Sequence, residues 1–498
     1  MPEAATEGNA NSSIKTWMLI CAPLVLFLSL AFIFYDCTVD DAFISFRCAR
    51  NLAQGHGLVF NIGDRVEAFS NPLWVLILSL AHMAGLDILT VSKLIGLGCG
   101  VITILLIMRL CRRSFSMSNG ATLAAMCYAA TNVSIVFYSV SGMETVVYMM
   151  VIVLMNCLIL DGREILAGIA CGALAVTRPE GIVFVIPLVL GCCLNRCRPG
   201  RILGAALIPV VTYGLFLLFR LGYYGGFFPN SYDAKIGGIT FSVDSMLYRA
   251  QALKRYTWNS SSIQAPVLFL SLAGIVVLFS RRSVPLIASV AAASFFVWLS
   301  KGDWMSFWRF YTPVIPFIVL FWAGTFEHIR PSLMRSKKGK LVLLIFLLPV
   351  LINFASTVKT RARLESGEEF NPAMHSKAHV SIGRYISEMS APSDVIVVNE
   401  IGAIGYYSDL TLIDMLGLTD SRVPELLRRG DLDDYADYVL GRDPRFIMLN
   451  DRQLPGDTGL HPVHAAIYDK MEETGLYRKE RVFRLNDFKN LMLFVKED

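Results

Sequence analysis

The sequence predicts a polytopic α-helical membrane protein that carries an α/β domain at its C-terminal end. Its 498 residues are 54% hydrophobic and only 17% charged, with a mean hydropathy of +0.53, which is more apolar than a soluble chain of this length requires. From residue 359 onward, 18 Lys/Arg and 24 Asp/Glu fall within 140 residues, so the acidic charge is concentrated there. We therefore expect a membrane domain over residues 1–358 and a soluble α/β domain over residues 359–498.

Eleven apolar runs in the first 358 residues are candidates for membrane-spanning helices. A helix needs about 17 to 25 mostly apolar residues to cross the hydrocarbon core. Two runs that flank the sequence TRPEG are shorter, and we expect them to form a hairpin with its turn at the membrane surface. The predicted spans are 17–35, 89–110, 119–138, 144–160, 164–177, 181–195, 202–221, 264–280, 284–300, 311–328 and 340–358.

The distribution of Lys and Arg in the short loops predicts the orientation of these spans. The basic residues fall on one side, which is cytoplasmic by the positive-inside rule. They are Lys15, Arg112, Arg113, Arg163, Arg196, Arg198, Arg201, Arg281, Arg282 and the cluster at 330–340. An odd number of spans then places residues 36–88 and the C-terminal domain outside. Because topology explains the basic excess, the net charge of +5 does not indicate a nucleic-acid partner.

The first outer region, residues 36–88, is too apolar to be a plain loop. DDAFISFRCARNLAQG places Phe43, Phe46 and Leu52 opposite charged positions, which predicts an amphipathic helix at the membrane interface. NPLWVLILSLAHMAGL is a 16-residue apolar run that follows. A surface helix at this run keeps the topology consistent, whereas a further span would invert everything after it. Residues 1–14 lack a cleavable signal pattern, so we expect the first span to remain as an anchor.

Charged residues recur where the predicted spans begin or end on the outer side. Ionisable groups are costly within a bilayer, and there they are candidates for function. Interfacial anchoring is the alternative explanation for each one, since Trp, Tyr, Lys and Arg are enriched at membrane surfaces. As a set, they favour one site at the outer surface. Its members are Asp40, Asp41, Glu144, Arg178, Glu180, Lys235, Lys301, Asp303, Trp304 and Arg309.

Seven short motifs resemble a bacterial branch of the C-type glycosyltransferase (GT-C) superfamily, and the mycobacterial terminal arabinofuranosyltransferases in particular. In order, they are DDAFISFR, GHGLVFNIGDRVEAFSNPLW, SGMET, TRPEG, PNSYDAK, KGDWM with a following RF, and GAIGYYSD…LIDMLGLTD. The resemblance implies an integral membrane enzyme that takes a pentose or hexose from a polyprenyl-phosphate carrier. It also implies that the acidic pair in the first outer loop is the catalytic centre and that cations bind the lipid phosphate. The acceptor would be an envelope glycan, glycolipid or protein outside the bacterial cytoplasmic membrane.

The chemistry of such a transfer suits these residue types. The anomeric carbon already carries a good leaving group, so the reaction needs only a base for the acceptor hydroxyl. On the resemblance, Asp40 is the base and Asp41 its partner, which orients the acceptor or binds a divalent cation, and direct displacement inverts the anomeric centre. Arg47, Arg178, Lys235, Lys301 and Arg309 are candidates for the phosphate. Candidates for contacts to the sugar are His56, Glu144, Glu180, Asn230, Tyr232, Asp303 and Trp304.

Residues 359–498, which the predicted topology places outside the membrane, are expected to form a small α/β domain. We expect strands at 394–399, 410–416, 445–450, 481–486 and 491–497, and helices at 377–390, 422–440 and 464–475. Gly402 and Gly405 lack the spacing of a dinucleotide fingerprint. All eleven cysteines precede residue 198, and no CxxC spacing occurs, so the sequence predicts neither a zinc nor a disulfide framework for this domain.

Two other classes of function remain open from the sequence. A transporter or flippase of a lipid-linked saccharide would carry charged residues through the bilayer midplane and inverted repeats, which the sequence does not show. A non-catalytic membrane scaffold would need the outer domain only to bind a partner. In that case, alanine at the acidic pair would affect stability alone.

Overall fold

The structure is a computed structural model that describes most of the chain. The described residues are 19–227, 229–230, 246–247, 251, 265–299, 305, 307–335, 346–366, 372–454, 457–460, 462–486 and 489–497. They form two compact units. The helical unit comprises Met1–Asp36, Ser92–Leu215 and Phe241–Ser366, and the mixed unit comprises Cys37–Val91, Phe216–Thr240 and Gly367–Asp498. The domain boundary at 358 stays a prediction, and the first outer region belongs to the same unit as the C-terminal residues.

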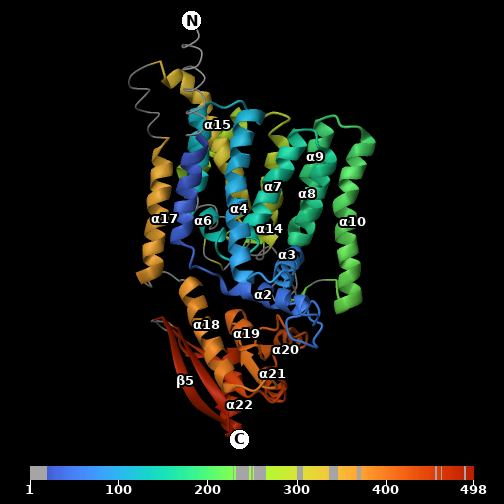
Figure 1. Ribbon diagram of the computed structural model, residues 1–498, viewed down its shortest axis with the longest axis vertical. Helices are drawn as coiled ribbons and strands as arrows, with labels where there is room; N and C mark the ends of the chain where they lie inside the picture. The colour runs from blue at the N-terminus through green and yellow to red at the C-terminus, as the bar shows by residue number, and fades with distance from the viewer. Residues whose placement is uncertain are drawn as a thin grey trace. The chain divides into compact units, whose positions relative to one another are not determined.

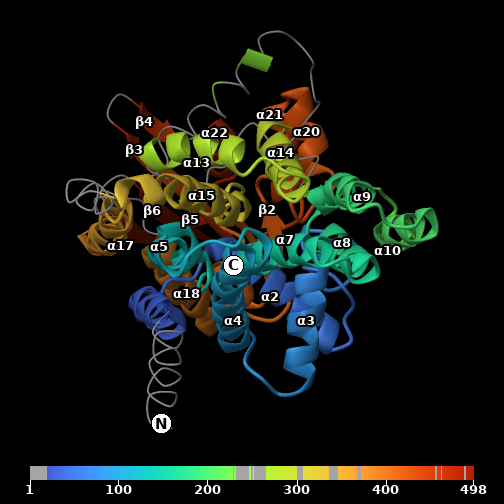
Figure 2. The same cartoon turned by 90° about the horizontal axis from the view of Figure 1, so that it is seen from above.

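The helical unit is a bundle of apolar helices that run side by side (Figures 1 and 2). Each predicted span overlaps a described helix. The helices are Leu19–Ile33, α4 (Ile88–Arg109, continued by a π-turn to Ser114), α5 (Asn119–Thr131), α6 (Val133–Tyr138), α7 (Thr145–Leu160), α8 (Glu164–Thr177), η2 (Pro179–Phe184), α9 (Val185–Leu194), α10 (Pro199–Tyr224), α13 (Ala265–Val277), α14 (Val284–Leu299), η3 (Thr312–Val314), α15 (Ile315–Leu333) and α17 (Leu348–Ser366).

The bundle has the surface of a membrane protein, although the number of crossings is not established. Apolar side chains of α10, such as Leu203, Leu207 and Val210, are exposed, as expected for a helix that faces lipid. Within the described residues, three helices are long and apolar enough to span a bilayer: Ile88–Ser114, Pro199–Tyr224 and Thr312–Leu333. The predicted count of eleven spans is therefore not confirmed.

Small residues let helices of the bundle pack closely. Gly274 of α13 faces the backbone of α15, where a Cβ atom on Gly274 would lie 1.8 Å from the carbonyl oxygen of Phe321. This separation is far below any van der Waals contact, so only glycine fits. Membrane helices associate through such packing, because lipid tails supply no hydrophobic force between them.

In the mixed unit, the first outer region forms two helices, as the sequence predicts. The amphipathic stretch forms α2 (Asp40–Ala53), which buries Phe43 and Phe46. The apolar run forms α3 (Pro72–Met83), with proline in its first turn. Helix α3 has 12 residues and is among the shorter apolar helices of the described chain.

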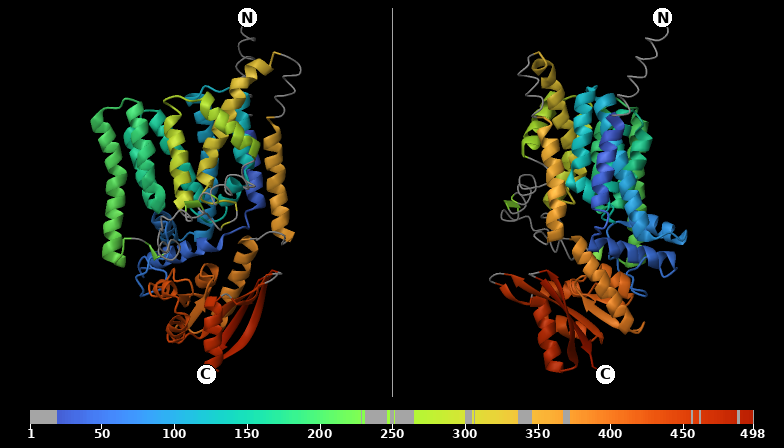
Figure 3. Two further views of the ribbon diagram at one scale, coloured as in Figure 1. Left: turned by 180° about the vertical axis from the view of Figure 1, so that it is seen from behind. Right: turned by 60° about the vertical axis from the view of Figure 1, so that its left-hand side comes forward.

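The C-terminal residues of the mixed unit form a mixed sheet in the order β2-β1-β3-β6-β5, with β4 paired to β3 (Figure 3). Strands β1, β2 and β3 are parallel, whereas β3, β6 and β5 are antiparallel. All five predicted strands are confirmed, and β4 is additional. The strands are β1 (Val395–Val398), β2 (Thr411–Asp414), β3 (Phe446–Leu454), β4 (Asp457–Leu460), β5 (Tyr477–Asn486) and β6 (Lys489–Lys496).

The helices around this sheet agree with the predicted helices except at two places. The predicted helix at 422–440 is divided at Gly430, which has a φ of +73° and ends the first part in a left-handed conformation. A short helix, α19, follows Gly402 and was not predicted. The helices are α18 (Pro372–Met389), α19 (Ala403–Ser408), α20 (Val423–Arg429), α21 (Leu432–Leu440) and α22 (Pro462–Thr474). Side chains of α20, α21 and α22 form a buried core with β1, β2, β3 and β6.

The close contact at Gly274 leads to a stability prediction. Gly274→Ala should destabilise the bundle, because its Cβ would force α13 away from α15. Gly214→Ala in α10 is the matched control, since a Cβ there meets nothing within 4 Å. Alanine is favoured over glycine in a helix by about 1 kcal/mol, so the control should be neutral or slightly stabilising. Thermal unfolding in detergent measures both, and equal midpoints for the two variants would contradict the prediction.

Candidate functional site

The acidic pair lies at the N-terminus of α2, where the helix dipole favours negative charge. Asp40 and Asp41 occupy the first turn, after Val39 at the N-cap. Both side chains are partly exposed, and that of Asp40 is 22% exposed. The sequence therefore places the two carboxylates correctly at the start of an amphipathic helix.

Three donors from the C-terminal part of the mixed unit converge on the Asp40 carboxylate. His379 of α18 donates from Nδ1 to Oδ1 over 2.9 Å. The backbone N–H of Ala403 donates to Oδ1 over 3.0 Å, and that of Gly402 donates to Oδ2 over 3.2 Å. Burial raises the pKa of Asp40, but the charge and hydrogen bond of His379 and the two N–H groups outweigh it, so the pKa lies below its usual value.

Arg47, a candidate phosphate ligand in the sequence, makes its hydrogen bonds within the mixed unit. Its guanidinium is buried and donates to the carbonyl oxygens of Phe60 at 2.8 Å, Gly405 at 2.6 Å and Leu410 at 2.7 Å. It also lies 4.4 Å from the centre of the Phe60 ring. Burial lowers the pKa of Arg47 to about 10, so it remains charged at neutral pH. All three guanidinium nitrogens are used within the fold.

Asn230 and His56 were candidates for contacts to the sugar. The Asn230 amide donates to the carbonyl oxygens of Gly417 at 2.6 Å and Asp420 at 2.8 Å, so it holds the turn after β2. His56 is exposed in the turn between Gly55 and Gly57. Their roles as sugar contacts stay predictions.

In the helical unit, Arg178 holds two acidic residues that the sequence had assigned to sugar contacts. Arg178 ends α8, and its side chain lies between two carboxylates, 2.9 Å from Glu144 and 2.5 Å from Glu180. All three side chains are at most 10% exposed. The sequence predicts that SGMET and TRPEG contribute to one place, and the structure brings these three residues together.

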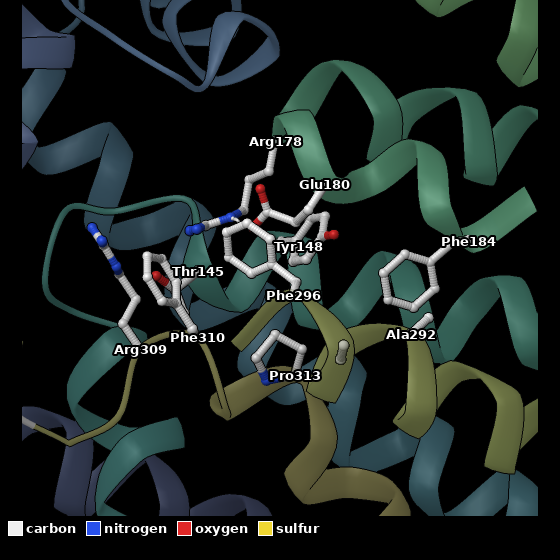
Figure 4. A pocket seen from close by; sticks show the side chains of 11 residues that line it. Thr145, Tyr148, Arg178, Glu180, Phe184, Ala292, Phe296, Arg309, Phe310 and Pro313 are labelled. Carbon is white, nitrogen blue, oxygen red and sulfur yellow. Dashed lines mark hydrogen bonds and ion pairs between the residues drawn. The ribbon is translucent and has the colours of Figure 1, made fainter. Parts of the chain in front are cut away.

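Arg178 and Glu180 line a small cavity together with aromatic side chains (Figure 4). Tyr148 and Phe310 lie on either side of Arg178, at 5.7 and 4.9 Å from their ring centres to its guanidinium carbon. Arg309 also lines the cavity, 4.5 Å from the Phe310 ring. The cavity therefore presents two guanidinium groups and the Glu180 carboxylate in a mostly buried setting.

The segment before Arg309 has an unusual backbone. Phe307 and Trp308 have φ values of +61° and +56°, in the left-handed region that is uncommon for bulky residues. The Phe307 carbonyl oxygen accepts a hydrogen bond of 2.8 Å from the Ser134 hydroxyl. Such strained conformations persist only where the surrounding structure enforces them, and they cluster at binding sites. This observation supports Arg309 as a candidate ligand.

Several candidates from the sequence lie outside the described residues: Tyr232, Lys235, Lys301, Asp303 and Trp304. Their roles stay predictions. Among the residues that the structure does describe, no group of three or more His, Cys, Asp or Glu side chains could hold a metal ion.

No sequence motif marks His379, which the structure identifies as a partner of Asp40. A single histidine in an amphipathic helix carries no motif, and 339 positions separate it from Asp40. Arg50 was not among the candidate site residues either, although it pairs with Asp409 at 2.5 Å. Only the fold brings these residues to α2.

A second acid in the mixed unit, Asp414 at the end of β2, has a pKa raised to about 7. Burial is the main cause, and the charges of Glu400 and Asp420 add to it, whereas the N–H groups of Leu416 and Leu418 act in the opposite direction. The usual pKa of this carboxyl, which applies to the unfolded chain, is 3.8. Between pH 3.8 and about pH 7, the folded protein therefore binds more protons at Asp414 than the unfolded chain does.

The stability of the mixed unit should therefore fall as the pH rises from about 4 to about 7, by at most about 1.4 kcal/mol per pH unit from Asp414. Asp414→Asn removes this titration and should flatten the dependence. Hydrogen exchange of β1 and β2 in the full chain, followed across this pH range, measures the effect. An unchanged slope in the variant would exclude Asp414 as the source.

A further prediction concerns the buried charges around Arg178. Arg178→Met should lower the free energy of unfolding by about 3 to 5 kcal/mol, because it leaves two buried carboxylates without their cation. Arg163→Met, at the exposed N-cap of the same helix, is the control and should change stability little. Chemical unfolding in detergent compares the two. Similar losses of unfolding free energy in both variants would show that the ion pairs of Arg178 do not cause the loss.

A family model described as a domain of unknown function (DUF8728) matches residues 370–490. In sequence, the chain is 24% identical over 280 residues to the terminal beta-(1->2)-arabinofuranosyltransferase of Mycobacterium tuberculosis. The match covers 51% of this chain and 43% of that protein, so the chain spans less than half the length of this relative.

Two solved structures match most of the chain. ArnT from Cupriavidus metallidurans, bound to undecaprenyl phosphate, has a TM-score of 0.58 at 12% identity and covers 96% of this chain and 97% of its own. The archaeal oligosaccharyltransferase AglB from Archaeoglobus fulgidus, in complex with an inhibitory peptide and a dolichol-phosphate, has a TM-score of 0.54 at 12% identity, with coverages of 87% and 70%. The resemblance indicated by the seven motifs is thus confirmed: the chain has the fold of the GT-C membrane glycosyltransferases and is similar in sequence to a mycobacterial terminal arabinofuranosyltransferase.

Proposed function

We propose that this chain transfers a sugar from a polyprenyl-phosphate carrier to a hydroxyl group of an envelope glycan, glycolipid or protein. The observation that carries the proposal is the acidic pair Asp40/Asp41 at the N-terminus of α2, in a chain whose fold is that of a protein crystallised with undecaprenyl phosphate. The sequence relative is named as an arabinofuranosyltransferase, which favours a pentose as the sugar.

The proposed reaction is a direct displacement at the anomeric carbon. The acceptor oxygen forms a bond to this carbon while the bond to the carrier phosphate breaks, and the electron pair leaves with the phosphate. The acceptor proton moves to one carboxylate of the acidic pair, as general base catalysis requires. Attack from the face opposite the leaving group inverts the anomeric configuration.

The cations of the helical unit are proposed to stabilise the phosphate as its negative charge increases. Arg178 and Arg309 both line the cavity beside Phe310, and an Arg guanidinium can bind a phosphate through two hydrogen bonds. Glu144 and Glu180 are bound to Arg178, so their proposed role is to hold this guanidinium rather than to contact the sugar. Arg47 is excluded from this role because the fold already uses its donors.

The surroundings of Asp40 do not fit a divalent cation. Three N–H groups point at this carboxylate, and donors of positive partial charge repel a metal ion. The proposed transfer therefore uses no metal at Asp40, and addition of EDTA is expected to leave transfer unchanged.

The proposed setting is the bacterial cytoplasmic membrane, crossed eleven times, with α2 and the C-terminal domain on its outer side. The positions of the basic loop residues support this orientation. A carrier that is confined to the bilayer would deliver its phosphate at the membrane surface, where a water-soluble acceptor can reach it.

The proposal predicts that purified protein converts polyprenyl-phosphate pentose and an envelope acceptor to a longer product. Asp41→Asn should slow this transfer by about 100- to 10 000-fold, which is the usual contribution of a general base. Asp64→Asn, exposed in the same outer region, is the control and should retain wild-type activity. Mass spectrometry of the products measures transfer, and NMR of the new linkage tests the inversion.

Two results would contradict the proposal. Full activity in both Asp40→Asn and Asp41→Asn would remove the acidic pair from the chemistry. Movement of an intact lipid-linked saccharide across proteoliposome membranes, without transfer to any acceptor, would favour a flippase instead.

A further inference from the structure

An open pocket of about 500 Å³ lies at one end of the helical unit, and the proposed transfer does not use it. Two short segments line the pocket. One is residues 114–116, which end α4 and its π-turn, and the other is residues 277–282, which end α13 and lead to α14. Arg282 joins the two segments, since its guanidinium donates to the Ser114 carbonyl oxygen over 2.9 Å.

The turn between α13 and α14 has the sequence SRRS and is closed by its own serines. The Ser280 N–H donates to the Ser283 hydroxyl oxygen over 2.9 Å, and this hydroxyl donates to the Ser280 carbonyl oxygen over 2.9 Å. The Ser283 N–H donates to the same carbonyl oxygen over 3.0 Å. Arg281 and Arg282 therefore occupy the two central positions of a hydrogen-bonded turn, and both are exposed.

The pocket is basic, and its two arginines have donors to spare. Arg281 makes no hydrogen bond or ion pair with any residue that the structure describes. Arg282 uses one guanidinium nitrogen for the Ser114 carbonyl oxygen. Among the described residues that line the pocket, none is acidic. The pocket therefore carries two positive charges without an acid of its own.

Two acids on nearby helices are paired with other arginines. The Asp161 carboxylate accepts a hydrogen bond from Arg109 and lies 3.6 Å from the Arg113 guanidinium. Glu327 of α15 pairs with Arg330 at 2.9 Å. These carboxylates already have cations, so the positive charge of the SRRS turn is left for an anion from outside the described chain.

Exposed apolar side chains of α13 lead to the SRRS turn. Leu272 is 53% exposed and Val276 is 76% exposed. Because they are four residues apart, they share one face of the helix. Phe279 is 69% exposed, follows the end of α13 and lines the pocket. In a membrane bundle such a face contacts lipid tails, so the arginines lie at the end of a lipid-facing stripe.

We propose that this pocket binds the phosphate headgroup of an anionic phospholipid of the bilayer. Arg281 and Arg282 contact the phosphate oxygens, and the hydroxyl groups of Ser116 and Ser280 add neutral donors. The acyl chains lie along the exposed face of α13. This lipid is a resident of the bilayer and not a substrate, so the inference goes beyond the proposed function and does not depend on it.

The chemistry of the pocket favours this ligand over two others. A soluble anion such as inorganic phosphate would satisfy the arginines but would leave the apolar side of the pocket unused. A zwitterionic phospholipid carries an ammonium group, which the arginines repel. An anionic phospholipid supplies both a phosphate, which Arg can bind through paired hydrogen bonds, and tails for the apolar face. Basic pockets between membrane helices are known to hold such headgroups.

Occupancy of the pocket should stabilise the bundle through α13. Helix α13 packs along α15 (Figure 2), and Gly274 brings the two backbones into direct contact. Arg282 connects the SRRS turn to the segment after α4. A ligand that binds only the folded protein raises its stability as occupancy increases. The bound headgroup would therefore raise the unfolding temperature of the helical unit.

Lipid binding and thermal unfolding of the purified full chain test this inference without any transfer assay. The probes are phosphatidylglycerol, phosphatidylcholine and inorganic phosphate, each added to the protein in detergent. Native mass spectrometry counts the lipid molecules that the protein retains. Phosphatidylglycerol should be retained, and should raise the unfolding midpoint, more than phosphatidylcholine. The difference should shrink as salt is added, because salt screens exposed charges.

Two variants locate the binding on the protein. Arg281→Gln should weaken retention of phosphatidylglycerol by about fivefold, which is the effect of one cation beside an anionic lipid. Its unfolding midpoint without lipid should equal that of the wild type, since Arg281 has no partner among the described residues. Arg198→Gln also removes an exposed charge, in the loop before α10 and outside the pocket. This control should retain phosphatidylglycerol as the wild type does.

Four results would overturn the inference. Equal retention of the two phospholipids by the wild type would show no selection for an anionic headgroup. Equal losses in Arg281→Gln and Arg198→Gln would assign the lipid to the basic surface as a whole. Displacement of phosphatidylglycerol by inorganic phosphate at matched ionic strength would indicate a site for a soluble anion. Preferential displacement by undecaprenyl phosphate would indicate a second site for a polyprenyl carrier. The salt dependence in the wild type decides the first point even if Arg281→Gln fails to fold.

Discussion

A charge removed from water must be paired, and this constraint organises both units of the protein. Arg178 lies between two buried carboxylates in the helical unit. In the mixed unit, Arg220 pairs with Glu67 at 2.6 Å, and both side chains are at most 2% exposed. Arg47 is satisfied by backbone carbonyls instead. Two of these ion pairs, Arg178 with Glu144 and Arg220 with Glu67, join segments that are distant in sequence, so buried charge helps to connect the chain.

The same constraint uses several of the candidate polar residues within the fold. Arg47, Glu144, Glu180 and Asn230 have donors or acceptors committed to other parts of the same unit. Residue type and position along the chain do not reveal these contacts, and only the structure shows them.

The close packing of glycines has a related effect on function. Gly402 allows the turn before α19 to reach the first turn of α2, where its N–H group meets the Asp40 carboxylate. In the helical unit, Gly274 allows α13 to contact the backbone of α15. Helices and turns that approach so closely have little freedom to move relative to each other. Such rigidity suits a site whose carboxylates must keep one orientation.

The sequence by itself determined most of the elements of this protein, although not β4, α19 or the break at Gly430. Apolar runs identified the helices of the bundle, and alternating or buried apolar stretches identified β1, β2, β3, β5 and β6, because periodicity reflects which face of an element is buried. The DD sequence also located the acidic pair at the start of α2. Tertiary structure alone decided the partners: His379 is 339 residues from Asp40, and Arg47 is 358 residues from Gly405. A hydrogen bond between such distant residues leaves no local pattern, since the fold and not the neighbouring residues creates it.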